Sequence, residues 1–322
     1  TRSTLDRFCI PVSSTPQKEY EMAPWTFVHV SDIHVGTPRS FRFQPAWNEN
    51  WQTARQQILD LEPEFLIVGG DLTRDGSTHR YELEQVKQDL DSLPFPYYVI
   101  PGNHDVGNKY QPDTSAAIKQ VAVDQFTDIF GSNHWSFIHK NVRFSGFNAL
   151  LAGSGHPAED EMWTWLKSQI DQPRSPHHVW ILHPALFVEE PTEPNWDVEA
   201  NRLEWIFGTD DPYRSRMLDV IRQTDAELVI TSHIHCRRRV IDDGITFQYS
   251  SAIAFPQRVP GWDDGDSTLG FLRYNVTELG IEPTFVPLSS VSEKEGYGGS
   301  PSLEERDYSI SWEKPSLKEL GL

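Results

Sequence analysis

Acidic, amide and imidazole side chains follow five separate apolar runs in this sequence of 322 residues. The runs span residues 25–30, 65–68, 97–100, 179–182 and 228–231, and polar residues begin directly after each of them. Carboxylate and amide oxygens together with imidazole nitrogens suit hard-to-borderline divalent metals, and no thiolate belongs to the set. The candidate metal-ligating residues are Asp32, His34, Asp71, Asn103, His183, His233 and His235.

Two pairs of these residues are separated by a single isoleucine, in Asp32-Ile33-His34 and in His233-Ile234-His235. On an extended backbone this spacing points both side chains of a pair to the same side. Each short motif taken alone is typical of an exposed turn. The prediction of one shared site therefore rests on finding all five polar groups in one chain, each after an apolar run.

Short runs rich in Val, Ile, Phe and Tyr predict buried strands, and segments with helical periodicity alternate with them. Apolar residues recur every three or four positions at 47–61, 78–93, 116–130, 159–171 and 212–223, which predicts helices. After His235 the sequence predicts strands alone, at 239–241, 245–249, 271–276 and 281–286. Alternation of strands and helices indicates an α/β fold, in which ligands bind at the carboxyl ends of the strands.

Three segments are expected along the chain: an N-terminal extension at 1–24, a catalytic domain at 25–286 and a C-terminal tail at 287–322. The first segment contains three prolines and no sustained periodicity, and the last is rich in Ser, Glu, Gly and Pro. We expect the tail either to wrap around the domain or to stay loose.

The composition excludes several classes of protein. A formal net charge of −19 disfavours general nucleic-acid binding, because most of such a surface repels phosphates. No apolar stretch is long enough for a membrane span. Two cysteines, Cys9 and Cys236, cannot form a disulfide framework, and no secretory signal is visible. These features predict a cytoplasmic protein, and they give no indication of its oligomeric state.

The ordered set of motifs resembles the calcineurin-like metallophosphoesterase superfamily. It comprises Asp32-x-His34, Gly70-Asp71, Gly102-Asn103-His104-Asp105, His183 and His233-x-His235, and the match extends over residues 25–286. The resemblance implies a four-layer α/β sandwich of two packed mixed sheets flanked by helices. It also implies hydrolysis of phosphate esters by a metal-bound hydroxide at a two-metal centre.

By the same resemblance, two divalent ions, each of them Mn, Fe or Zn, share Asp71 as a bridging ligand. The first ion takes Asp32, His34 and His235 as its other ligands, and the second takes Asn103, His183 and His233. A bridging carboxylate is physically required, because two dications about 3.5–4 Å apart repel each other strongly.

His104 and Asp105 are the candidate catalytic residues outside the ligand set. His104 is expected either to protonate the leaving group or to donate a hydrogen bond to a phosphate oxygen. Asp105 is expected to orient the His104 ring and favour its imidazolium form, and a plain turn or helix-capping role is the alternative. Ser232 departs from the resembled pattern, which has glycine there, so a required positive φ would be strained.

Individual residues narrow the branch of the superfamily. Arg74 stands where purple acid phosphatases carry the tyrosine that holds ferric iron, and Asp105 stands where calcineurin-type protein phosphatases carry glutamate. A nuclease function is disfavoured, because a net charge of −19 repels the phosphates of DNA. The expected function is therefore a small-molecule or nucleotide phosphodiesterase acting on a small phosphate ester.

Two alternatives stay open. The segment from His183 to Phe187 with the acidic residues after it resembles phosphomonoesterases, which act on phosphoproteins or small monoesters. The second alternative is a non-catalytic member of the superfamily that only binds partner proteins. Such a protein would lack some of the metal ligands, and this sequence contains all of them.

Specificity is expected from four loops, at 36–47, 107–114, 184–211 and 256–266. Their aromatic side chains can stack on an organic group, or simply hold the loops to the domain. Their basic side chains can neutralise phosphate. The aromatic candidates are Trp196, Trp205, Phe255 and Trp262, and the basic ones are Arg39, Arg42, Lys109 and Arg258.

Overall fold

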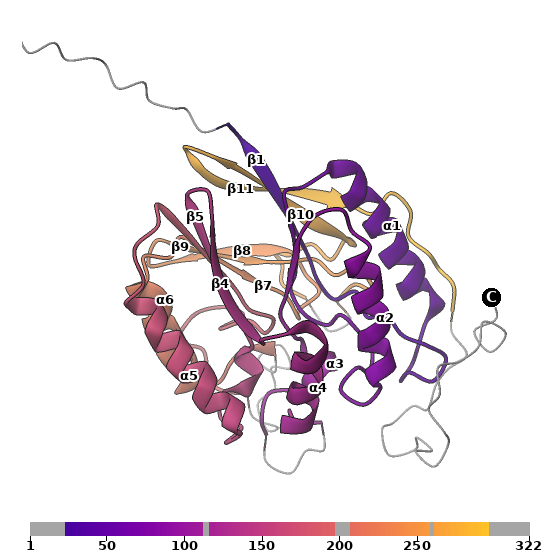
Figure 1. Cartoon of the computed structure of the whole chain (residues 1–322), viewed down its shortest axis with the longest axis horizontal. Helices are drawn as coiled ribbons and strands as arrows, with labels where there is room; N and C mark the ends of the chain where they lie inside the picture. Colours follow the sequence, from indigo (N-terminus) through magenta and orange to yellow (C-terminus); the bar gives the residue numbers. More distant parts are fainter. Residues whose placement is uncertain (1–22, 112–115, 197–206, 258–260, 296–322) are drawn as a thin grey trace, which may run out of the picture.

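In the computed structural model, the described residues are 23–111, 116–196, 207–257 and 261–295. They form two β-sheets that pack face to face, and helices cover the outer face of each sheet (Figure 1). The predicted four-layer α/β sandwich is therefore confirmed. The described part of the chain contains no helix that is both long and apolar enough to cross a membrane.

The first sheet has five strands in the order β11-β10-β1-β2-β3. Strands β1, β2 and β3 run parallel, and β10 pairs with β1 in the antiparallel sense. The bounds are β1 Trp25–Val30, β2 Leu66–Val68, β3 Tyr97–Val99, β10 Gly270–Thr277 and β11 Gly280–Pro287, and the connecting helices are α1 Pro45–Leu61 and α2 Arg80–Asp91.

The second sheet has six strands in the order β4-β5-β6-β7-β9-β8. Its central strands β5, β6, β7 and β9 are parallel, and the outer strands β4 and β8 are antiparallel to their neighbours. The bounds are β4 His134–His139, β5 Val142–Phe147, β6 His177–Ile181, β7 Leu228–Thr231, β8 Arg238–Asp242 and β9 Ile245–Tyr249, and the helices are α3 Asn103–Val106, α4 Gln120–Phe130, α5 Pro157–Ile170 and α6 Tyr213–Gln223, with a 3₁₀ turn at Ala149–Leu151.

Alternation along β1 shows how one strand joins two layers. Phe27 points into the aromatic-rich core between the sheets, where it stacks on Phe65 and Tyr274. Val28 and Val30 belong to the larger core that includes the helices. Successive side chains of a strand point to opposite faces, so a run of apolar residues buried on both sides is expected here.

The strand pair β4–β5 was not predicted from the sequence. Its β4 residues are mostly half-buried, so the run lacks the uniformly apolar character of the central strands. The helix predicted at 116–130 begins only at Gln120, and the four-residue helix α3 directly after Gly102 was also missed. Elements as short as α3 form through a few hydrogen bonds and are too short to show a periodic pattern in the sequence.

The first residues of the predicted tail pack along α1. Leu288 is buried in the main core. The backbone N–H of Ser292 donates to Asn50 at 2.8 Å, and the Ser292 hydroxyl donates to Glu49 at 2.6 Å. Residues 288–294 thus continue the folded domain, while 1–22 and 296–322 lie outside the described residues.

Candidate metal centre

The predicted ligands come together where strands of both sheets end. Asp32 and His34 follow β1, Asp71 follows β2, Asn103 begins α3, His183 follows β6, and His233 and His235 follow β7. Their ligand atoms form two groups, each with all atoms within 4.8 Å of one another. The groups are Asp32, His34, Asp71 and His235, and Asp71, His183 and His233, so that Asp71 belongs to both.

Five of these residues adopt a left-handed backbone. Ten non-glycine residues of the described chain have positive φ, and half of them are Asp32, His34, Asp71, His233 and His235, with φ between 46° and 71°. This conformation costs about 1–2 kcal/mol per residue, and such strain clusters at functional sites.

The expectation of an extended backbone in the two spaced pairs is therefore wrong. The isoleucines between the paired residues, Ile33 and Ile234, are both fully buried in the main core. Their apolar side chains hold each loop to the core while the flanking polar side chains turn toward the site. The structure thus brings each pair together by a local twist of the backbone instead of strand alternation.

In the first group, two imidazole nitrogens face each other. His34 Nε2 lies 3.4 Å from His235 Nε2 and 3.6 Å from Asp71 Oδ2, and His235 Nε2 lies 3.1 Å from Asp32 Oδ1. The Nδ1 atom of His235 donates to the Phe255 carbonyl at 2.7 Å. That hydrogen bond leaves the lone pair of Nε2 directed at the group, as a metal-ligating histidine requires.

In the second group, the Nδ1 atom of His183 donates to the Gly69 carbonyl at 2.8 Å. Its Nε2 atom then faces Asn103 Oδ1 at 3.2 Å and Asp71 Oδ2 at 3.4 Å. Burial by itself lowers the pKa of His183, but the nearby carboxylates of Asp71 and Asp32 raise it to about 9. Positive charge is therefore stabilised at the position where Nε2 meets the two oxygens.

Buried charge provides the test of whether metal ions fit. The Asp32 and Asp71 side chains are almost fully buried. Burial opposes their ionisation, yet neighbouring histidines hold the pKa of each below its usual value. Across the described ranges, neither carboxylate is paired with a lysine or arginine. Two buried carboxylates without a permanent cationic partner fit a site for divalent cations.

His104 lies beside the two groups and lines the cavity described below. Its Nδ1 atom donates to the Arg74 carbonyl at 2.7 Å, and its Nε2 atom lies 3.3 Å from the Arg74 guanidinium. Burial lowers the pKa of His104, against the effect of Asp71. This contradicts the expectation that its surroundings favour the imidazolium.

Asp105 does not contact the His104 ring, so the expectation that it orients that ring is wrong. Its carboxylate accepts hydrogen bonds from the backbone N–H groups of Leu72, Thr73 and Gly102 at 2.9–3.1 Å, and from the Thr73 hydroxyl at 2.6 Å. Asp105 thus ties the loop after β2 to the start of α3. The alternative turn-residue role is the one that the structure shows.

Close backbone approach explains the glycines of the motifs. A Cβ atom on Gly102 would lie 2.1 Å from the backbone nitrogen of Asp71, and one on Gly70 would lie 2.4 Å from the His183 ring. Gly70 also has a φ of +99°, which favours glycine. Ser232 has no positive φ, since the left-handed residue is His233, so the strain expected at Ser232 is absent.

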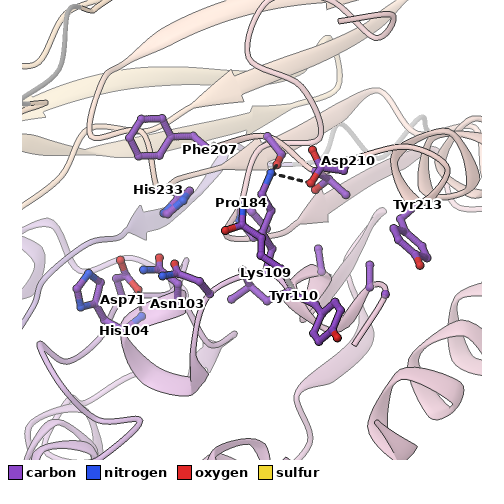
Figure 2. A pocket seen from close by; sticks show the side chains of 18 of the residues that line it. Asp71, Asn103, His104, Lys109, Tyr110, Pro184, Phe207, Asp210, Tyr213 and His233 are labelled. Atoms are coloured by element: carbon purple, nitrogen blue, oxygen red, sulfur yellow. Dashed lines mark hydrogen bonds and ion pairs between the residues drawn. The ribbon is translucent and has the colours of Figure 1, made fainter. Parts of the chain in front are cut away.

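A cavity of about 570 Å³ opens from the ligand groups (Figure 2). The end of the cavity nearest the candidate ligands includes Asp71, His233 and His235, and Phe255 packs on the rings of His34 and His235 at 4.9 and 4.4 Å. The loops 107–114, 184–211 and 256–266 all contribute lining residues, as expected of specificity loops.

Several other expectations for the loops are resolved by the structure. The lining includes no residue of the loop at 36–47. Trp262 packs near Arg238, and Cys236 is buried in the core. Trp205 and Arg258 lie outside the described residues. Sequence reasoning missed Phe207, Asp210 and Tyr213 as lining residues, because nothing local distinguishes them from other loop positions.

Comparison with known proteins identifies the family. The sequence model of the calcineurin-like phosphoesterases matches residues 26–237. The chain belongs to this family. Serine/threonine-protein phosphatase CPPED1 of Danio rerio is 25% identical over 311 residues, covering 90% of this chain and 93% of that protein. A 3′,5′-cyclic-nucleotide phosphodiesterase of Nostoc sp. is 26% identical over 289 residues, covering 82% and 97%.

Solved structures show the same fold as this calcineurin-like phosphoesterase. GAP50 of Plasmodium has a TM-score of 0.57 at 13% identity, covering 87% of this chain and 91% of that one. Purple acid phosphatase PPD1 of yellow lupin has a TM-score of 0.56 at 11% identity, covering 85% and 53%. Membership of this family, together with the two sequence relatives, identifies the chain as a metal-dependent hydrolase of phosphate esters.

Proposed function

We propose that this phosphoesterase is a two-metal phosphodiesterase that acts on small organic diesters. One divalent ion would be held by Asp32, His34 and His235, and the other by Asn103, His183 and His233, with Asp71 shared. The proposal is supported by the place of Asp71 in both ligand groups and by the inward-facing Nε2 atoms. Bound there, the ions would supply Lewis acidity and an activated water.

The protein side chains would position the ester and manage its proton. His104 lies on the cavity wall with Nδ1 bonded to the Arg74 carbonyl and Nε2 3.3 Å from the Arg74 guanidinium, so an ester oxygen that meets Nε2 would replace that guanidinium contact. The backbone N–H of His104 donates to Asp71 Oδ1 at 2.8 Å, which supports that carboxylate from outside the ligand groups. Phe207 packs on the His233 ring at 5.0 Å, and Phe255 packs on the His235 ring at 4.4 Å.

The charge of the cavity supports the proposed preference for diesters. Lys109 is the one lysine or arginine among the described lining residues, and its ammonium lies 3.0 Å from Asp210 Oδ2. That pair is neutral overall. Beyond the metal ions, the cavity therefore offers little charge to a dianionic monoester, whereas a monoanionic diester needs less compensation.

The experiment compares methyl p-nitrophenyl phosphate with p-nitrophenyl phosphate on the metal-reconstituted protein. Both release the same phenolate, so the comparison isolates the ester class. We expect kcat/KM to be at least about tenfold higher for the diester, which is about 1.4 kcal/mol. Asp71→Asn, assayed in parallel, controls for a contaminating phosphatase.

A phosphomonoesterase is the second candidate. It is favoured by the CPPED1 relative, named a serine/threonine-protein phosphatase, which aligns with 90% of this chain. A monoester preference in the same assay would select this candidate and reject the first. Hydrolysis of a phosphoserine peptide would then separate a phosphoprotein substrate from a small monoester.

A further inference from the structure

The cavity extends well beyond the ligand groups. We call its far part the distal half, defined by Tyr110, Ala149, Leu150, Ala152, Gly153 and Tyr213. Figure 2 shows Tyr110 and Tyr213 on the opposite side of the Lys109–Asp210 pair from Asp71, His104 and His233. A volume of about 570 Å³ is in the range of pockets that hold a drug-sized ligand, which is much more than a phosphate group needs.

The distal half has an apolar floor and aromatic walls. Ala149 and Leu150 belong to the 3₁₀ turn after β5, and the Asn148 side chain fixes that turn by accepting from the Leu150 N–H at 3.2 Å. The Tyr213 ring packs so closely on Gly153 that a Cβ atom there would lie 2.7 Å from the ring. Rigid apolar and aromatic surfaces of this kind bind planar organic groups.

A polar element lies between the two halves. Lys109 Nζ donates to the Gly208 carbonyl at 2.8 Å and pairs with Asp210 Oδ2 at 3.0 Å. The other Asp210 oxygen accepts from the Trp196 N–H at 3.0 Å. An ammonium group has three N–H donors, so one N–H of Lys109 is left to donate to a ligand. The neighbouring Asp210 carboxylate can accept a further hydrogen bond from the same ligand.

Both segments that carry this pair are fixed to the fold. Residue Asn108 bridges to Ala117, and Gly208 bridges to Ala185. The Thr209 N–H and hydroxyl both donate to the Ala185 carbonyl, at 2.9 and 3.0 Å. The pair is thus held in place before any ligand binds, which reduces the entropy lost on binding.

From these observations we infer that the distal half is a binding subsite for an aromatic or similarly planar organic group of the phosphate ester. The Lys109–Asp210 pair would recognise a neutral hydrogen-bonding substituent on that group, one that offers both a donor and an acceptor. This inference rests on the proposed function, because it places the phosphate at the metal-ligand groups and the organic group in the distal half.

The test uses phosphonate inhibitors with an unreactive C–P bond. Methylphosphonate and 2-naphthylmethylphosphonate share the anchoring group and differ only in the organic group. Inhibition constants are measured on the metal-loaded protein with methyl p-nitrophenyl phosphate as reporter substrate. We expect the naphthyl compound to bind at least about tenfold more tightly, and equal constants would overturn the inference.

Variants then assign that preference to the distal half. Tyr213→Ala should reduce the ratio of the two inhibition constants about tenfold, because it removes one aromatic wall. Tyr97→Ala is the matched control, since Tyr97 is also half-buried but lies on β3 outside the cavity lining. A ratio that survives Tyr213→Ala unchanged would show that the naphthyl group binds elsewhere and would overturn the inference.

A second variant tests the polar element independently of Tyr213. 4-Carbamoylbenzylphosphonate should bind more tightly than benzylphosphonate, about fivefold, and Lys109→Met should abolish this gain. No gain in the wild-type protein would overturn the role of the Lys109–Asp210 pair. If the reporter is not hydrolysed at all, the proposed function fails, and calorimetric titration of the same phosphonates still decides whether the distal subsite exists.

Discussion

The substitution Gly102→Ala tests how tightly the backbone must pack for the candidate metal centre to form. Gly102 has a φ of −102°, which any residue can adopt, so the new methyl group is the whole perturbation. Its Cβ atom would lie 2.1 Å from the Asp71 backbone nitrogen and 2.2 Å from Asp71 Oδ1. Real Cβ contacts are essentially never under 3.0 Å, so the two segments must separate by about 0.9 Å.

That displacement acts on the residue shared by both ligand groups. A misplacement of about 1 Å costs about 10²-fold in rate, equivalent to about 2.7 kcal/mol of transition-state stabilisation. Overpacking of this kind also destabilises a fold by about 1–3 kcal/mol. We therefore expect kcat/KM to fall about 10²-fold, together with a loss of bound metal.

The measurements are kcat/KM on methyl p-nitrophenyl phosphate, metal equivalents per chain, and the free energy of unfolding in urea. Gly261→Ala is the matched control, because a Cβ atom there would meet nothing within 4 Å. It should leave all three quantities close to those of the wild type. If Gly102→Ala kept full metal content and kcat/KM within threefold, the reasoning from backbone contact would be refuted.

Three further variants test the shared Asp71 carboxylate, the His104 ring and the buried His178 ring. Asp71→Asn should lose bound metal and at least about 10²-fold in kcat/KM, because a neutral amide cannot offset the repulsion between two dications. A variant that kept two metal ions and normal turnover would contradict the role of Asp71 as a ligand shared by both ions. His104→Ala should keep its metal, and its kcat/KM should fall about 10²–10⁴-fold on esters with alkoxide leaving groups but less on esters that release nitrophenolate. An equal fall in kcat/KM on both kinds of ester would instead indicate that His104 donates a hydrogen bond to a phosphate oxygen. Burial lowers the pKa of His178 from 6.5 to about 4, where the ring bonds Ser145 at 2.9 Å and the Thr224 carbonyl at 3.3 Å. The unfolded chain therefore takes up this proton first, so His178 alone should cost about 2 kcal/mol of stability between pH 7.5 and pH 5. In urea titrations without metal, the stability of His178→Gln should fall by about that much less than the stability of the wild-type protein, and equal falls would contradict this role of His178.

The sequence alone determined the fold class and which polar side chains come together at the strand ends. Apolar runs and helical periodicity are local properties, and the parallel sheet places the carboxyl ends of its strands at one edge. The types of side chain after each run, from Asp32 to His235, were therefore enough to predict which residues meet. The sequence also identified three of the loops that line the cavity, at 107–114, 184–211 and 256–266, but it did not identify the lining residues from Ala149 to Gly153.

Only the tertiary structure decided how these residues meet. The left-handed backbone of Asp32 and His233 depends on packing of the neighbouring isoleucines in the core, and the contacts of Asp105 depend on the distance between two loops. The distal half of the cavity combines Tyr110 with Tyr213, which are far apart in the chain. Such contacts leave no mark on local composition or periodicity, because long-range packing of separate elements creates them.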